Sequence, residues 1–585
     1  MLATPNRRLV FKQLGAGVAL MACLAAATAD MRAAPEPATG RATKQTVTAR
    51  EYMAAAAHPL AAQAGEEILE RGGNAIDAMV AVQFMLNLVE PQSSGIGGGA
   101  FLLYWDADAE RLHAFDGRET APLDAGPDYF LGSDGEPLPF WEALVGGRSV
   151  GVPGTLLLLE TVHRRFGSMD WGELIEPTVQ LARRGFEISP RLEQSIASER
   201  EHDLDRFDAA KAYFFDDEGN PRKAGTVLRN PEFADTLEQI ARHGSRVFYE
   251  GDLAREIVRT VRESPNPGLM TLDDLRRYSV NERDSVCLPY RAFRVCGMGP
   301  PTSGGLTVGQ ILGILSHFDM AGLPRAEAVH LYLEAAKLAY ADRGRYMADS
   351  DFVDVPARGL LDPEYLESRS ALVDEARAME EAQPGEPPGS RAASRTGYRQ
   401  PEPAGTSHFV IRDAQGNALS MTTTIETGFG SRLMVGGFLL NNELTDFSFR
   451  PEIDGDPVAN RVEGGKRPRS SMAPTIVFHD SRPYLLLGSP GGSRIINYVA
   501  KSLVAVLDWE IDLQEALDMC HFANRNGATE LEQDCDANDL RPALEARGHR
   551  MEDREMNSGI HAILIHDGVL HGAADSRREG VVLGR

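Results

Sequence analysis

A stretch in the second half of the chain decides the fold, and it reads Gly405-Thr406-Ser407-His408-Phe409-Val410-Ile411-Arg412-Asp413-Ala414-Gln415-Gly416-Asn417-Ala418-Leu419-Ser420-Met421-Thr422-Thr423-Thr424. Two apolar runs flank a loop that contains glycine, which is the pattern of a β-hairpin. A hairpin that is symmetric about Gln415 places Thr406 directly opposite Thr424. The sequence therefore predicts two threonine side chains that face each other on adjacent strands.

The residues before the hairpin have the composition of a flexible linker. Between Gln383 and Gly405, five prolines lie among Gly, Ser, Arg and Ala, and such a segment buries no face. The linker ends at Thr406, whose hydroxyl becomes a nucleophile if a cut frees its own α-amino group to act as the base. That amine has a reference pKa of about 7.7–8.0, so part of it is neutral at pH 7. Taken alone, a threonine at the start of a strand is usually only a good strand former.

The remaining patterns indicate an α+β fold in which helices cover sheets. Helical spacing runs over residues 59–71, a second apolar helix capped by Asn74 extends to Pro91, and residues 153–376 are mostly amphipathic helix. The last 180 residues are rich in antiparallel strand. Further hairpins are expected there at residues 475–487 and 560–570, with a helix over 494–507 between them.

Length and composition exclude several classes of protein. The 585 residues are 43% hydrophobic and 25% charged, which permits a large core and rules out a disordered tail or a small disulfide scaffold. The net charge of −25 repels phosphate backbones and argues against nucleic-acid binding. We expect a small molecule as the partner.

The N-terminus predicts export. Arg7-Arg8 precede an apolar run from Leu14 to Ala27 and a small-residue cleavage site, so residues 1–29 have the features of a signal peptide. We expect cleavage after Ala29 and a periplasmic protein, with a twin-arginine signal or a lipoprotein modified at Cys23 as alternatives. The apolar run is too short for a transmembrane anchor, and no later segment supplies a span.

The remaining cysteines leave two possibilities open. In an oxidising compartment Cys287, Cys296, Cys520 and Cys535 could form two disulfides, and free buried thiols fit the sequence about as well. The chain lacks Cys-x-x-Cys, His-Glu-x-x-His and calcium-loop patterns, so we expect no metal and no cofactor.

Two other glycine-rich motifs are weak candidates. Residues 95–100 match a dinucleotide fingerprint but follow a helix and precede a strand, the reverse of the required order, so a structural turn is expected. Residues 147–151 match the nucleophile elbow with Ser149 at its centre, yet Gly151 and Pro153 postpone the helix that an elbow needs. A plain loop is the favoured interpretation, and a Ser149 esterase is a minor alternative.

Many motifs, in order and over nearly all of the chain after the signal, resemble the γ-glutamyltransferases (glutathione hydrolases), which are N-terminal-nucleophile hydrolases. Before the linker the resemblance lies in residues 72–78, 97–101, 118–119, 151–154 and 301–305. After it the matching motifs are residues 406–409, 422–426, 441–447, 466–472 and 488–494.

The resemblance implies a four-layer αββα sandwich made as a proenzyme. The precursor would cut itself between Gly405 and Thr406 into a large subunit of residues 30–405, including the linker 383–405, and a small catalytic subunit of residues 406–585. These two fragments would pair as a heterodimer.

It also implies the catalytic residues. Thr406 would be the nucleophile of both self-cleavage and catalysis, and Thr424 would hydrogen-bond to it. The backbone N–H groups of Gly491 and Gly492 would stabilise the oxyanion. Independently of the family, these glycines precede a predicted helix, where N–H groups lack intrahelical partners. A tight structural turn at this position is compatible with that role.

Donor recognition is implied in the same way. Arg118, with the hydroxyls of Ser470 and Ser471, would bind the α-carboxylate of a γ-glutamyl group, because guanidinium and carboxylate form paired hydrogen bonds. Its α-ammonium would be held by three acids: Glu426, Glu443 and Asp446. Without the resemblance, the ordinary interpretations are solvated surface charges for the acids and a structural ion pair for Arg118.

Two departures from the family pattern bear on the donor. Glu426 stands where the best-known members have asparagine, which adds a negative charge to the ammonium pocket. The segment from Asp446 to Lys466 is shorter than in members with a full lid and lacks the lid tyrosine. A different acyl side chain, such as glutaryl, therefore becomes conceivable.

The function expected is that of an autoprocessed γ-glutamyltransferase. Thr406 would attack the γ-glutamyl amide of glutathione-like donors, and water or the amine of an amino acid or peptide would resolve the γ-glutamyl-enzyme. The alternatives are an amidase of the same fold that resembles cephalosporin (glutaryl) acylases, and an exported solute-binding protein without catalysis.

Overall fold

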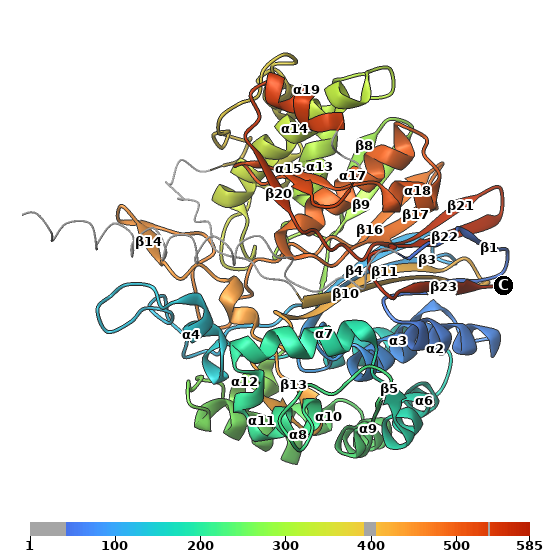
Figure 1. Ribbon diagram of the computed structural model, residues 1–585, viewed down its shortest axis with the longest axis vertical. Helices are drawn as coiled ribbons and strands as arrows, with labels where there is room; N and C mark the ends of the chain where they lie inside the picture. Colours follow the sequence, from blue (N-terminus) through green and yellow to red (C-terminus); the bar gives the residue numbers. More distant parts are fainter. Residues whose placement is uncertain (1–41, 391–404, 536–538) are drawn as a thin grey trace, which may run out of the picture.

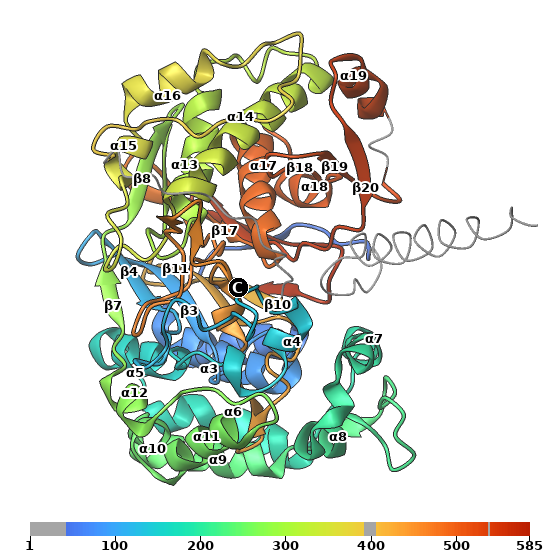
Figure 2. The same ribbon diagram turned by 90° about the vertical axis from the view of Figure 1, so that its left-hand side faces the viewer.

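The computed structural model describes residues 42–390, 405–535 and 539–585. Two seven-stranded sheets lie face to face in the middle of the molecule, with one helical layer above them and another below (Figure 1). The view turned by 90° shows the same order of layers (Figure 2). The predicted α+β fold and its four-layer αββα arrangement are therefore confirmed.

The first sheet holds the predicted hairpin at its centre. Its strands, in spatial order, are β23 (Val581–Gly584), β2 (Met53–Ala56), β10 (Gly405–Arg412), β11 (Ala418–Glu426), β3 (Gly99–Asp106), β4 (Arg111–Gly117) and β7 (Asn281–Arg283). All neighbouring strands in this sheet are antiparallel.

The second sheet is also antiparallel. Its order is β1 (Val47–Ala49), β22 (Val569–Ala574), β21 (His561–His566), β17 (Arg482–Gly488), β16 (Thr475–His479), β9 (Phe293–Gly297) and β8 (Val286–Tyr290). The two later hairpins expected from the sequence are β16–β17 and β21–β22, so both predictions are confirmed.

Helices cover the outer face of each sheet. The layer on the first sheet includes α2 (Pro59–Glu70), α3 (Ala75–Val89), α5 (Thr155–Phe166) and α6 (Trp171–Arg184). The layer on the second includes α13 (Gly304–Leu315), α14 (Arg325–Tyr346), α17 (Ile495–Leu507) and α18 (Leu513–Asp518). Asn74 caps α3 as predicted, through hydrogen bonds from the backbone N–H groups of Ile76 and Asp77.

Alternation along β3 divides the core in two. Ala100, Leu102 and Tyr104 pack with the helical layer, and Phe101 and Leu103 pack between the two sheets. Successive side chains of a strand point to opposite faces, so both faces of this strand are apolar because both are covered. The central strands are thereby fixed between two apolar layers.

The register of the hairpin agrees with the sequence. Thr406 pairs with Thr424 and Arg412 with Ala418, which are the pairs expected for a turn about Gln415. The register shifts between Gly405 and Thr406, where Gly405 pairs with Glu426. The predicted cleavage site thus lies at an irregularity in the ladder.

The glycine-rich turn of residues 95–98 lets the chain pass close to this hairpin. A Cβ atom on Gly98 would lie 1.9 Å from the carbonyl oxygen of Thr424, and one on Gly97 would lie 2.1 Å from that of Leu439. No side chain fits at either position. The structural turn expected for this motif is what the structure shows.

The middle of the chain is mostly helical, as expected, but it also contains a pair of strands that was not expected. Residues 286–290 and 293–297 form β8 and β9, and Cys287 is joined to Cys296 across this pair. A second disulfide joins Cys520 to Cys535, so of the two possibilities for the cysteines the structure has disulfides. Helix α13 is buried on all sides rather than amphipathic.

Several expectations concern residues that are described only in part. The signal peptide and Cys23 lie outside the described residues, as does the 391–404 part of the linker. Gly385 at its start is hydrogen-bonded to Asp342 and Tyr346 on α14, so this end of the predicted linker is packed. No helix in the described ranges is both long and apolar enough to cross a membrane.

The layered core predicts the cost of a truncation. Leu103→Ala removes a fully buried side chain between the sheets and should lower the free energy of unfolding by about 2–5 kcal/mol. Leu372→Ala, at a leucine that is 54% exposed, should change it by less than about 0.5 kcal/mol. Thermal and denaturant unfolding of the two variants measures the difference, and equal losses would contradict this division of the core.

Candidate active site

A small pocket gathers most of the predicted site residues at the start of β10. It has an empty volume of about 280 Å³. Its lining comprises Arg118, Thr406, Thr424, Glu426, Glu443, Asp446, Ser470, Ser471, Met472, Gly492, Ser493 and Ile495. Every predicted catalytic and donor-binding residue except Gly491 lines it, and Gly491 immediately precedes Gly492.

Three hydrogen bonds connect the two threonines with the peptide bond at the predicted cleavage site. Thr406 Oγ donates to Thr424 Oγ over 3.3 Å, and Thr424 Oγ donates to the Gly405 carbonyl oxygen over 2.6 Å. The backbone N–H of Glu426 donates to Thr424 Oγ over 2.8 Å. A hydroxyl has one donor and two acceptor positions, so Thr424 uses its whole capacity here. Thr424 thereby polarises the carbonyl beside the candidate nucleophile.

At the other end of the pocket lies the buried guanidinium of Arg118. It forms ion pairs with Glu443 and Asp446, which come from the short helical turn at residues 443–446. It also donates to the carbonyl oxygens of Pro468 over 3.2 Å and Arg469 over 3.3 Å. Arg118 therefore forms a structural ion pair, which is the ordinary interpretation of a buried arginine.

Sequence reasoning missed Glu119, the residue next to Arg118. Its carboxylate is fully buried, 3.9 Å from that guanidinium and beside the carboxylate of Glu443. Burial, together with the neighbouring Glu443, raises the pKa of Glu119 well above its ordinary value. Burial also raises the pKa of Glu443 to about 7, although Arg118 opposes the shift. At neutral pH we therefore assign the proton to Glu119.

Glu426 brings a third carboxylate to the pocket. One oxygen each of Glu426, Glu443 and Asp446 lie within 4.8 Å of one another. The carboxylate of Glu443 is buried beside Glu119, whose neutral form is a hydrogen-bond donor to it. Glu426 also has a left-handed backbone with φ of 77°, a conformation that costs a glutamate about 1–3 kcal/mol. Strain of this kind collects at functional sites.

The two serines contact the pocket from the loop before β16. Ser471 Oγ accepts a hydrogen bond from Arg343 over 2.6 Å, and Ser470 Oγ accepts one from the Met472 N–H over 3.1 Å. Arg343, on α14, also donates to Ser303 over 2.9 Å. No sequence pattern predicted that Arg343 would contact the pocket residue Ser471.

Gly491 and Gly492 form the turn between β17 and α17. Their φ angles are 132° and 58°, and a Cβ atom on Gly491 would lie 2.5 Å from the ring of Tyr498. The turn ends at the start of the helix, where N–H groups have no intrahelical acceptor. The structure shows the tight turn and places Gly492 in the pocket lining, and the oxyanion role of the two glycines stays a prediction.

Ser149 does not lie in this pocket. It is fully buried in a short helical turn, and its hydroxyl donates to the carbonyl oxygens of Leu144 and Gly146. A nucleophile elbow requires an exposed serine. The structure contradicts the esterase alternative.

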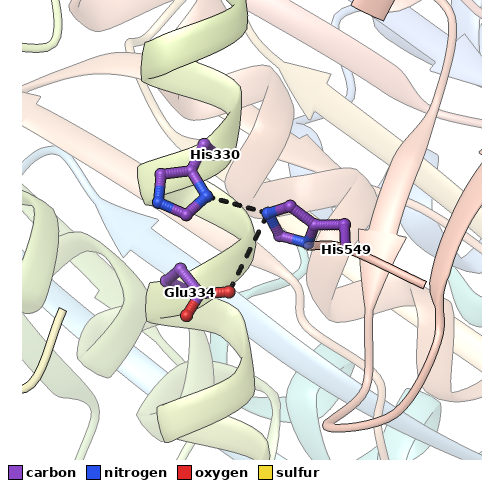
Figure 3. A group of neighbouring side chains, drawn as sticks. All are labelled: His330, Glu334 and His549. Atoms are coloured by element: carbon purple, nitrogen blue, oxygen red, sulfur yellow. Dashed lines mark hydrogen bonds and ion pairs between the residues drawn. The ribbon is translucent and has the colours of Figure 1, made fainter. Parts of the chain in front are cut away.

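A group of metal-binding residue types lies elsewhere, at His330, Glu334 and His549 (Figure 3). His330 and His549 are joined by a 2.8 Å hydrogen bond, and Glu334 is paired with the ammonium of Lys337 at 2.8 Å. Since Lys337 already neutralises the carboxylate, a cation there would be repelled. We interpret the group as a polar contact between α14 and the chain after α19 (Leu540–Ala546).

Comparison with known proteins identifies the family. The family model described as Gamma-glutamyltranspeptidase matches residues 61–585. The glutathione hydrolase proenzyme of Bacillus subtilis (strain 168) is 37% identical over 554 residues, which cover 92% of each chain. The gamma-glutamyltranspeptidase of Helicobacter pylori superposes with a TM-score of 0.54 and 33% identity, over 59% of this chain and 97% of that one.

An acylase has a similar structure. The cephalosporin acylase from Bacillus halodurans superposes with a TM-score of 0.83 and 26% identity, over 94% of this chain and 98% of that one. The family model spans both sides of the Gly405–Thr406 bond and includes all the residues that line the pocket. The chain belongs to the gamma-glutamyltranspeptidase family.

Proposed function

We propose that this chain is made as a proenzyme that cuts itself between Gly405 and Thr406 and then acts as a γ-glutamyltransferase and glutathione hydrolase. The large subunit comprises residues 30–405 and the small catalytic subunit residues 406–585, and the two stay together as a heterodimer. The donors are glutathione-like γ-glutamyl compounds, and the acceptors are water or the amine of an amino acid or peptide.

The contacts at the cleavage site support self-processing. Thr406 Oγ attacks the Gly405 carbonyl, and the acyl group moves from nitrogen to oxygen to give an ester that water hydrolyses. One hydrogen bond runs from the attacking hydroxyl to Thr424, and another runs from Thr424 to the carbonyl oxygen. The proton lost by the nucleophile thus has a path to the oxygen that gains charge.

In turnover the freed α-amino group of Thr406 takes the place of a separate base. Thr406 Oγ attacks the γ-glutamyl amide, and the Gly491 and Gly492 N–H groups stabilise the oxyanion. The leaving amine departs with a proton, and a γ-glutamyl ester of Thr406 remains. Water or an acceptor amine then attacks that ester and releases Thr406.

One observation carries the choice of donor: three carboxylates and one guanidinium meet in the pocket that contains Thr406. A γ-glutamyl group ends in an α-ammonium and an α-carboxylate. Glu426, Glu443 and Asp446 hold the ammonium through charge-assisted hydrogen bonds. Arg118, Ser470 and Ser471 hold the carboxylate.

The similarity to a cephalosporin acylase suggests a glutaryl donor as the alternative, but that donor fits this pocket less well than a γ-glutamyl donor. It has the carboxylate but lacks the ammonium, so it would add a negative charge to a pocket that already holds three carboxylates and would bring no cation with it. Like charges held close together in a protein repel each other. We therefore place the acylase activity second.

Export to the periplasm completes the proposal. The predicted signal peptide supports it, and so do the two disulfides, because disulfides persist in oxidising compartments. Lipidation at Cys23 remains the alternative form of the same export.

Thr406→Ala should give a single uncut chain without amidase activity, because no hydroxyl remains to attack Gly405. N-terminal sequencing of the bands on a denaturing gel measures this, and the wild type should show a small band that begins Thr-Ser-His-Phe. Thr406→Ser keeps the hydroxyl and should still mature, and Ser149→Ala should mature and stay active. If the Thr406→Ala chain were still cut, Thr406 would not be the nucleophile. A wild-type chain that is neither cut nor active would instead favour a solute-binding protein.

The donor is tested with γ-glutamyl-p-nitroanilide and glutaryl-p-nitroanilide, which differ only in the α-ammonium. Hydrogen bonds to charged groups contribute about 1.5–3 kcal/mol each, so kcat/KM should favour the γ-glutamyl compound by roughly 100-fold. Glu426→Gln should narrow this ratio, while Glu452→Gln, on the exposed hairpin beyond the pocket, should leave it unchanged. A glutaryl compound that is hydrolysed equally well would establish the acylase alternative.

The pH dependence of donor binding should follow Glu443. Its pKa of about 7 means that the carboxyl is neutral below pH 7 and charged above it, while the donor ammonium is charged throughout. KM for γ-glutamyl-p-nitroanilide should therefore rise as the pH falls through 7, and Glu443→Gln should flatten the profile and raise KM at pH 8. A wild-type KM that stays constant from pH 6 to 8 would contradict the role of Glu443.

A further inference from the structure

The strand that begins at Thr406 is paired unequally on its two sides. Its pairing with β11 runs from Gly405 to Arg412, whereas its pairing with β2 runs only from Phe409 to Arg412. Strand β2 ends at Ala56, which pairs on its far side with Val581 of β23. On the β2 side, the first residues of β10 thus lie beyond the end of the neighbouring strand.

The loop of residues 575–580 reaches this side of β10. It joins β22 of the second sheet to β23 of the first, and it carries the buried Arg578. The guanidinium of Arg578 donates to the carbonyl oxygen of Thr406 over 3.4 Å. A side chain therefore supplies the hydrogen bond that a longer β2 would give to the nucleophile residue.

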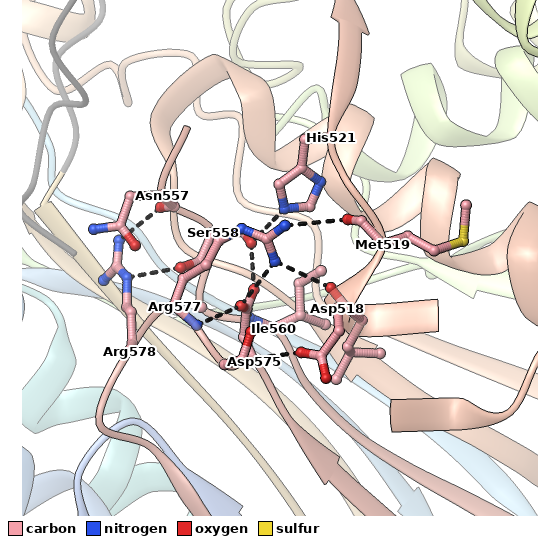
Figure 4. A network of polar contacts seen from close by, with 12 residues as sticks. Asp518, Met519, His521, Asn557, Ser558, Ile560, Asp575, Arg577 and Arg578 are labelled. Atoms are coloured by element: carbon pink, nitrogen blue, oxygen red, sulfur yellow. Dashed lines mark hydrogen bonds and ion pairs between the residues drawn. The ribbon is translucent and has the colours of Figure 1, made fainter. Parts of the chain in front are cut away.

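The same guanidinium also contacts a second segment of the chain. It donates to the carbonyl oxygens of Ser558 over 2.9 Å and of Asn557 over 3.1 Å (Figure 4). An arginine has a planar head with five N–H donors in fixed directions, so bonds to three carbonyl groups set their relative positions. Arg578 joins the start of β10 to the chain just before β21.

That second segment lies against the turn that supplies the oxyanion donors. The Gly559 N–H donates to Ser489 Oγ over 3.4 Å. A Cβ atom on Gly559 would lie 2.8 Å from the ring of Pro490 and 2.7 Å from Arg578 Cδ, so only glycine fits between them. Arg578 is thus in contact with Thr406 on one side and, through residues 557–559, with the turn before Gly491 on the other.

The loop that carries Arg578 is itself held from the N-terminal part of the chain. Lys44 Nζ donates to the carbonyl oxygens of Asp575, Arg578 and Gly580 over 2.6, 2.7 and 2.6 Å. These three bonds use all the donors of an ammonium group. The Ala42 N–H donates to the Ser576 carbonyl oxygen over 2.9 Å. Residues 42–44 thereby fix the backbone on which Arg578 sits.

Buried hydrogen bonds and ion pairs hold the loop of residues 575–580 on its other side (Figure 4). Asp575 accepts hydrogen bonds from Ser558 Oγ and from the guanidinium of Arg577. Arg577 also forms a two-point ion pair with Glu532 at 2.6 and 2.7 Å, and His521 contacts Ser558 Oγ at 2.6 Å. With its groups hydrogen-bonded on both sides, the loop is a rigid base for Arg578.

We propose that Arg578, held in place by Lys44, is a positioning residue that fixes Thr406 relative to the Gly491–Gly492 turn. The inference rests on the proposed function, since it concerns the geometry of that reaction. Arg578 does not line the donor pocket, so it acts through the nucleophile residue and not on the donor. A displacement of about 1 Å between reacting groups can cost roughly 100-fold in rate.

The test compares kcat and KM for γ-glutamyl-p-nitroanilide in Arg578→Met, Arg578→Lys and the wild type at one temperature well below melting. Arg578→Met should lower kcat by roughly 10–100-fold and change KM by less than about threefold. Arg578→Lys keeps the charge but cannot reach three carbonyl groups, so kcat should fall nearly as far. Full activity in Arg578→Lys would mean that charge and not geometry matters, which would overturn the proposal.

Arg291 provides a matched control at the edge of the second sheet. Its guanidinium likewise donates to three carbonyl oxygens, those of Leu315, Ser316 and Phe318, far in the fold from Thr406. Arg291→Met should lower the melting temperature and leave kcat within about twofold of the wild type. An equal loss of kcat in the two methionine variants would show a general effect on stability and would also overturn the proposal.

Lys44→Met provides a second route, because it leaves Arg578 itself in place. It should lower kcat in the same direction with KM unchanged, and it decides the question if Arg578→Met yields no folded protein. A kcat within twofold of the wild type would overturn the role of Lys44 and, in that case, the proposal. Processing and turnover of the wild type are measured first, so that a failure of the proposed function is seen there, before any variant is compared.

Discussion

The pairing of β10 with β11 is the constraint on which the rest of the site depends. It places Thr406 opposite Thr424 and puts the Gly405 carbonyl within 2.6 Å of the Thr424 hydroxyl. Both strands lie in the interior of a sheet that is covered on both faces, so a slip of one residue would move every side chain into the opposite layer of the core and disrupt the packing of both layers. The core therefore serves chemistry as well as stability, because it determines which two hydroxyl groups meet.

The electrostatics of the pocket form a second constraint. Arg118 is buried with Glu443 and Asp446, and Glu426 and Glu119 add two more carboxyl groups close by. Such a group is tolerated because burial raises the pKa of Glu119, which favours its neutral form, and because Arg118 has carbonyl oxygens as further acceptors. Arg118 is shared among several acids, so an incoming ammonium relieves repulsion between them as well as forming new bonds.

The sequence predicted what depends on local pattern. The hairpin register, the Asn74 cap and the turn at Gly491 follow from residues that are near each other in the chain, and the family motifs named most of the pocket. Strand β8 was not predicted, because it is short and contains Pro289. Proline is tolerated in an edge strand, but it weakens the strand pattern in the sequence. The contacts of Arg343, Arg578 and Lys44 were not predicted, for another reason. Arg343 contacts Ser471, Arg578 contacts Thr406 and Lys44 contacts the loop of residues 575–580, across separations of 128 to 536 positions, and no spacing rule reports such pairs.

The order of strands has a consequence for a chain that is cut at Gly405. In the first sheet β10 and β11 lie between β2 and β3, and in the second sheet β22 to β16 lie between β1 and β9, so segments from before and after the cut alternate. Two such fragments share hydrogen-bonded sheets and are not merely docked along a surface. Separating them would require the shared sheets to come apart, because neither fragment has a complete core of its own, so they would dissociate far more slowly than two proteins docked along a surface. The cut would release an amine for catalysis while the molecule remains, mechanically, one folding unit.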